Sequence, residues 1–145
     1  MSFARQVRAF AVKSEKALDQ TVRAITFSLF REVVQRTPVG DPSRWKSPAP
    51  AGYVGGRLKG NWQVSIGSPA VGTLETIDAT GTATVGKIAA GIGGFGTVTY
   101  LTNNLSYAMP IEYDGWSSIA RQGMVRVSFA RIDNIVAQAA RANRV

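Results

Sequence analysis

The sequence predicts an α+β fold, in which a long N-terminal helix and a C-terminal helix pack on a small antiparallel sheet. Apolar residues recur at helical spacing in residues 2–36 and again after Gly123, and short β-branched or aromatic runs lie between these stretches. A length of 145 residues with 45% hydrophobic residues is enough for one domain, residues 1–145, with a core of its own. A long Pro/Gly-rich arm, residues 38–61, follows the first helix.

The first helix is expected over residues 2–36, with Ser2 as its N-cap and Pro38 just beyond its end. If continuous, it is about 50 Å long at about 1.5 Å per residue, more than a domain of this size covers. We therefore predict that its N-terminal third projects and packs on a neighbouring subunit; the alternative is that residues 1–12 fray. The apolar stripe follows steps of four or three: Leu18, Val22, Ile25, Leu29 and Val33.

The middle of the chain reads as strands separated by turns and one weak helix. Residues 62–66 alternate as a short strand, and residues 97–102 form the clearest strand because β-branched and aromatic residues fill them. Residues 70–76 fit a second, weaker strand. A helix with Asp78 as its cap is expected through about Ala90, although its glycines and threonines make it a poor one.

The C-terminal part is expected to be helical. Residues 107–113 fit either an irregular segment or one helical turn. The last helix follows Gly123 and carries an apolar stripe. Residues 124–129 also alternate like a strand; we favour a helix. The stripe consists of Val125, Phe129, Ile132, Val136 and Ala139.

The arm contains too many prolines and glycines for a helix interior or a central strand. It also holds Trp45, Tyr53 and several cations, which a purely flexible spacer would lack. We interpret it as a docking arm anchored through Trp45, Tyr53 and Arg57; the alternative is a passive loop packed on its own domain. Its other cations are Arg44, Lys46 and Lys59.

Composition excludes the enzyme chemistry that needs histidine or cysteine and leaves carboxylate, lysine or hydroxyl chemistry as the alternative. The chain has neither histidine nor cysteine, so the usual zinc sites, Ser-His-Asp triads and Cys-His pairs are ruled out. The nine acids are scattered, and the glycines of residues 91–96 lack the preceding strand and following helix of a dinucleotide site. We predict a protein that is not an enzyme and that needs no cofactor or metal.

No apolar run reaches the length of a membrane span.

The net charge of +8 favours an acidic partner: nucleic acid, an anionic membrane or an acidic protein surface; the alternative is that it only keeps the protein soluble.

The tryptophans are expected in different surroundings. Trp62, in an alternating strand, is expected in the core. Trp45 and Trp116 are either interface anchors or lids over the domain's own core. Tyr107, Tyr113 and Trp116, with a nearby arginine, also suit base stacking, so a basic nucleic-acid-binding module is the alternative function.

Three segments taken together resemble a known family. They are TPVGDPSRWKSPAPAGYVGGRLKGNW (residues 37–62), YLTNNLSYAMPIEYDGWS (residues 100–117) and RQGMVRVSF (residues 121–129). Their order is similar to that in small neck and tail-completion proteins of long-tailed bacteriophages, including tail-component and minor tail protein Z-like sequences. The matching positions are Gly56-Arg57-Leu58 with Trp62, Asn103-Asn104, Tyr107-Ala108 and Glu112. The sequence departs from the pattern at Asp114-Gly115 and Ile119-Ala120.

The resemblance implies a structural virion protein that forms a ring at the head–tail junction, where it completes the tail or joins it to the DNA-filled head. Its partners would be other copies of itself in a sixfold ring, the neighbouring neck or connector ring, and tail tube proteins, with DNA passing through the channel and no membrane involved. It would reside in the virion, and in the host cytoplasm during assembly. The predicted contact residues are Arg44, Trp45, Lys46, Tyr53, Arg57, Lys59, Tyr107, Glu112, Tyr113 and Trp116.

Overall fold

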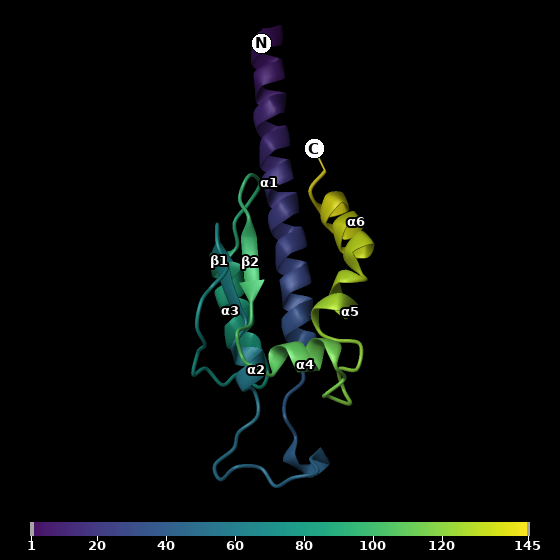
Figure 1. The fold of residues 1–145 in the computed structure, drawn as a ribbon. Coiled ribbons are helices and arrows are strands. Elements are labelled where there is room, and N and C mark those ends of the chain that lie inside the picture. The colour runs from purple at the N-terminus through teal and green to yellow at the C-terminus, as the bar shows by residue number, and fades with distance from the viewer. Residues whose placement is uncertain (1, 145) are drawn as a thin grey trace.

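The computed structural model describes residues 2–144 and has the α+β architecture that the sequence predicts (Figure 1). One long helix, α1, is the axis of the molecule. The sheet and α3 lie on one side of it, α5 and α6 lie on the other, and α4 crosses near its C-terminal end. The elements are α1 (Phe3–Arg36), η1 (Pro42–Arg44), α2 (Arg57–Gly60), β1 (Gln63–Ile66), α3 (Thr82–Gly91), β2 (Thr99–Thr102), α4 (Ala108–Tyr113), α5 (Val125–Phe129) and α6 (Ile132–Ala142).

Helix α1 is continuous and projects from the body of the molecule, as predicted. The Ser2 hydroxyl accepts a hydrogen bond from the Arg5 backbone N–H at 3.3 Å and caps its start. Every residue from 2 to 13 is exposed, and in Figure 1 this part of the helix extends past all other elements. The helix ends at Arg36 because Pro38 disfavours helical backbone at Thr37. Packing of the projecting part on a neighbour stays a prediction.

The sheet has two antiparallel strands, β1 and β2, paired from Gln63 opposite Thr102 to Ile66 opposite Thr99. The weak strand predicted for residues 70–76 is wrong. In the structure this segment is irregular, because its backbone bonds to a side chain instead of a strand: the Leu74 N–H donates to Asn61 Oδ1 at 2.7 Å.

Helix α3 begins at Thr82, three residues later than predicted, and Asp78 binds its first turn without being the N-cap residue. One carboxylate oxygen accepts from the Gly81 N–H at 3.1 Å and the other from the Thr84 N–H at 2.8 Å. Burial raises the pKa of Asp78, but the hydrogen bonds from Thr84, Gly81 and Thr80 outweigh it, so the pKa lies below its usual value. Asp78 therefore holds the start of α3 as a carboxylate.

Two short helices replace the single C-terminal helix that the sequence predicts. Residues 125–129 are helical, so helix is the correct alternative there, but the chain turns at Ala130 and Arg131 before α6 begins. Helix α6 buries Ile135 and Ala139 in the body and runs alongside α1. Residues 107–113, left open between an irregular segment and a helical turn, contain α4.

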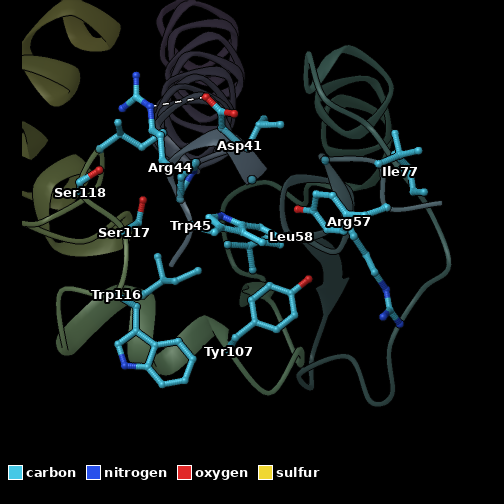
Figure 2. A pocket seen from close by; sticks show the side chains of 18 residues that line it. Asp41, Arg44, Trp45, Arg57, Leu58, Ile77, Tyr107, Trp116, Ser117 and Ser118 are labelled. Carbon is cyan, nitrogen blue, oxygen red and sulfur yellow. Dashed lines mark ion pairs between the residues drawn. The ribbon is translucent and has the colours of Figure 1, made fainter. Parts of the chain in front are cut away.

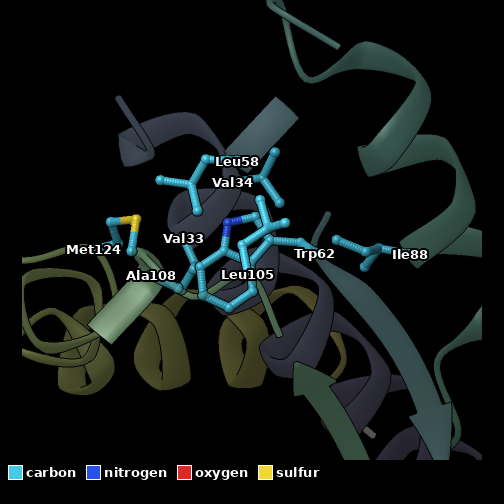
Figure 3. Close-up of a cluster of buried hydrophobic side chains, with 8 residues drawn as sticks. All are labelled: Val33, Val34, Leu58, Trp62, Ile88, Leu105, Ala108 and Met124. Carbon is cyan, nitrogen blue, oxygen red and sulfur yellow. The ribbon is translucent and has the colours of Figure 1, made fainter. Parts of the chain in front are cut away.

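The hydrophobic core lies near the C-terminal end of α1 (Figure 3). Trp62 is buried there, as predicted, and its indole N–H donates to Thr37 Oγ1 at 2.7 Å, while the Thr37 hydroxyl donates to the Val33 carbonyl at 2.7 Å. This chain of bonds attaches the end of α1 to the beginning of the sheet. The core residues are Val33, Val34, Leu58, Trp62, Ile88, Leu105, Ala108 and Met124.

The arm is shorter than predicted. Residues 57–60 form α2, and Leu58, Lys59 and Gly60 are buried. The arm is therefore residues 38–56, and it lies at the opposite end of the molecule from the N-terminus (Figure 1).

Candidate functional site

The arm and the segment of residues 107–119 face each other across a cavity of about 760 Å³, which we call the docking cavity (Figure 2). Residues far apart in the sequence meet here, because α2 and α4 bring the two segments to the same end of α1. The cavity is lined by Pro38, Val39, Gly40, Asp41, Arg44, Trp45, Tyr53, Val54, Gly56, Arg57, Leu58, Ile77, Tyr107, Ile111, Trp116, Ser117, Ser118 and Ile119.

The arm is folded on itself and has a defined shape. The Asp41 carboxylate accepts from the Ser43 N–H at 3.1 Å and from its hydroxyl at 2.6 Å, which caps η1. The rings of Trp45 and Tyr53 meet edge to face, with centroids 4.8 Å apart. A side chain at Gly40 would collide with Tyr53, so glycine is needed there for close approach. The aromatic pair gives the arm an apolar surface toward the cavity.

The opposite wall comes from α4 and the loop that follows it. Tyr107 is half-buried, whereas Trp116 is 68% exposed and available for contacts. Burial raises the pKa of the Tyr107 hydroxyl; the Arg57 guanidinium opposes this shift and Tyr53 adds to it. The hydroxyl is therefore neutral at physiological pH. A neutral phenol beside apolar rings suits contact with a partner's side chains. Among the described residues that line the cavity, the one carboxylate is that of Asp41, which already caps η1.

Glu112 holds this wall in place. It is buried, and its carboxylate accepts from the backbone N–H groups of Met124, Val125 and Arg126, which start α5. The Arg126 guanidinium lies 3.7 Å from the same carboxylate. A side chain at Gly123 would collide with Glu112, and Gly123 has a φ of 88°. Glu112 thus joins α4 to α5 and fixes the cavity wall that α4 carries.

A second cavity of about 650 Å³, which we call the cationic cavity, adjoins the docking cavity. The two cavities share Pro38, Val39, Ser118 and Ile119 as lining residues. Three cations line the cationic cavity, and none of its described lining residues is acidic or aromatic. These cations are Arg36, Lys59 and Arg121.

Six of the ten predicted contact residues line the docking cavity: Arg44, Trp45, Tyr53, Arg57, Tyr107 and Trp116. The other four lie elsewhere. Lys46 is exposed on the arm, and Lys59 is buried in the cationic cavity. Glu112 has the internal role described above, and Tyr113 is exposed with the Arg126 guanidinium 4.9 Å from its ring centroid.

Sequence reasoning missed the apolar residues that complete the docking cavity. Val54, Ile77 and Ile119 line it from three different loops. No local pattern distinguishes them from other isolated apolar residues. Arg36 was also missed, because a basic residue in the last turn of a helix is ordinary.

Within residues 2–144, no cluster of three acidic, histidine or cysteine side chains is placed to hold a metal ion. Among the described helices, none combines the length and apolar character needed to cross a membrane. Comparisons of the chain with protein-family models, curated proteins and solved structures find no match.

Proposed function

We propose that the protein is a structural virion protein that forms a homo-oligomeric ring at the head–tail junction of a tailed bacteriophage. The observation that carries the proposal is the projecting part of α1. Phe3, Val7 and Phe10 recur at steps of four and three along one side of the helix and are 80%, 50% and 64% exposed. Burying such a side chain contributes about 1.5–3 kcal/mol, so this stripe favours association.

A neighbouring copy is the proposed partner for this stripe. A helix projecting beyond its own core gains no tertiary stabilisation along that length, although most helical stability in proteins comes from packing. A second copy can supply the missing contact when α1 helices, or α1 and a neighbour's body, lie together. Repetition of one such contact around an axis closes a ring, and six copies would match a sixfold tail tube.

The docking cavity is the proposed contact to the next layer of the virion, either the connector ring above or the tail tube below. It lies at the opposite end of the molecule from the free end of α1, so both contacts can form at once. Its aromatic and arginine side chains belong to the types that anchor protein interfaces. The order of motifs shared with neck and tail-completion proteins supports the same placement. In this role the protein acts by geometry and catalyses no reaction.

The test measures the mass of the purified protein by light scattering over a range of concentrations and images any large species. We expect a ring, and we expect the Phe3→Ser/Phe10→Ser double variant to be monomeric. Serine and phenylalanine have similar helix propensities, so the helix itself is kept. Val71→Ser is the matched control, because Val71 is 91% exposed and lies outside the helices and strands. Persistent monomers of the unaltered protein, also with tail tubes present, would overturn the proposal.

A nucleic-acid-binding module is the second candidate function. The observations that favour it are the net charge of +8 and the exposed ring of Trp116. If it is correct, affinity for single-stranded polynucleotide falls steeply between low and physiological salt, with a slope that follows the number of phosphates contacted. Weak binding with little salt dependence would exclude it.

A further inference from the structure

Lys59 is a cation whose stem is buried and whose ammonium group reaches solvent without a direct partner in the described chain. The residue is 8% exposed, and no hydrogen bond or ion pair joins its ammonium group to another described residue. Its aliphatic stem packs beside Gly81. Burial lowers the pKa of Lys59, and the charge of Asp78 opposes this shift without a direct contact. Because its ammonium group reaches solvent with no bond of its own, Lys59 is free to bind an acidic group of a partner.

The surroundings of Lys59 add to its positive charge. Arg36 and Arg121 line the same cationic cavity, and no acid lines it among the described residues. Arg36 lies 3.8 Å from Glu32, a long separation for an ion pair, and Glu32 also binds Arg131. Within residues 2–144 Arg121 forms no ion pair, and its side chain is exposed. Three cations thus line one cavity, and no described acid lines it with them.

We propose that the cationic cavity binds a carboxylate side chain from an acidic segment of a protein partner, with Lys59 as the innermost contact. Aliphatic residues complete the walls, among them Val39, Ile119 and Val127, and they suit the methylene stem of a glutamate. Charge-assisted bonds from lysine and arginine to a carboxylate are among the stronger polar contacts in proteins. The proposal rests on the proposed function and specifies the chemistry of its partner.

A protein partner fits the cationic cavity better than a nucleic acid, because no aromatic side chain is among the described residues that line it. Stacking of bases needs free ring faces beside the phosphate contacts. Because the two cavities share one wall, a single partner segment can place an apolar side chain in the docking cavity and a carboxylate in the cationic cavity.

The experiment compares a labelled peptide of alternating glutamate and leucine with the same peptide carrying glutamine in place of glutamate. Fluorescence anisotropy measures affinity for the full chain and for Lys59→Met, with Lys87→Met as the matched control, because Lys87 is exposed on α3. We expect Lys59→Met to weaken binding of the glutamate peptide roughly tenfold or more and Lys87→Met to leave it nearly unchanged.

Nuclear magnetic resonance of the Lys59 side chain supplies a second readout. A bound carboxylate favours the charged amine, so the pKa of Lys59 should rise with the glutamate peptide and stay unchanged with the glutamine peptide. Equal affinity for both peptides, or an unchanged affinity of Lys59→Met, would overturn the inference. The inference would also be overturned if binding of a single-stranded oligonucleotide depended on Lys59 and binding of the glutamate peptide did not. Ring formation by Lys59→Met is measured separately, so failure here with rings intact leaves the proposed function standing.

Discussion

Replacing Glu112 by glutamine tests whether one buried carboxylate holds α4 and α5 together. The change keeps the size of the side chain and removes its charge. In the native structure three backbone N–H groups, those of Met124, Val125 and Arg126, donate to the carboxylate. Glutamine offers one acceptor oxygen, and its NH₂ group can turn a donor toward these N–H donors.

The expected loss follows from the number of bonds. A hydrogen bond to a charged group contributes about 1.5–3 kcal/mol, and a neutral one about 0.5–1.5 kcal/mol. Losing about 1 kcal/mol at each of the three donors gives about 3 kcal/mol. Small domains unfold at a total cost of about 5–15 kcal/mol, so this loss is a large fraction of the stability. At about 2–4 °C per kcal/mol, the melting temperature should fall by about 6–12 °C.

Urea unfolding followed by tryptophan fluorescence measures the difference, with Glu75→Gln as the control. The Glu75 side chain is 93% exposed and lies 3.7 Å from Arg57, so its loss should change the free energy of unfolding by less than about 0.5 kcal/mol. If the free energy of unfolding of Glu112→Gln is less than about 1 kcal/mol below that of the unaltered protein, the role assigned to this carboxylate is refuted.

Three further predictions concern the start of α3, the Glu112 site and the arm. Burial raises the pKa of Asp78, but the hydrogen bonds that its carboxylate accepts lower it further, so the folded pKa lies below the unfolded value. The stability that Asp78 contributes is therefore present above about pH 4 and is lost as the pH falls through the folded pKa. In an acid titration of unfolding, Asp78→Asn should lose less stability than the unaltered protein. Gly123→Ala should destabilise the fold by about 1–3 kcal/mol in thermal unfolding, because Gly123 has a positive φ and lies against the Glu112 carboxylate. Gly86→Ala is the control: it lies in an open position within α3 and should stabilise the fold by about 0.5–1 kcal/mol. Equal effects of the two substitutions would contradict this reasoning. Trp45→Ala should leave the chain folded by circular dichroism but prevent head–tail joining, and a normal yield of particles would remove the arm from the proposed mechanism.

Local patterns predicted the elements whose side chains repeat regularly. The stripe of α1 and the alternation of β1 and β2 are properties of neighbouring residues, so they could be recognised without knowing the fold. The segment of residues 70–76 was assigned wrongly because a side chain, Asn61, took the backbone bond that a strand would have made. The C-terminal helix was predicted as one element because its apolar stripe runs through the break at Ala130.

The candidate site was predicted in its parts but not as a site. Trp45, Tyr53 and Trp116 stood out because large aromatic residues in loops are unusual among prolines and glycines. The cavity between them depends on the path of the chain, which brings the arm against residues 107–119. The sequence could not show that Lys59 is buried, because an Arg-Leu-Lys segment reads equally well as an exposed turn.

The sequence by itself therefore determined the class of fold, the length of α1 and the exclusion of histidine and cysteine chemistry, because these depend on composition and on contacts between near neighbours. Only the tertiary structure decided that Glu112 is an internal cap, that two cavities share a wall, and that three cations line one cavity with no acid among its described lining residues. Such features join residues that are distant in the chain. Their positions follow from how helices and loops pack, and no local pattern records that packing.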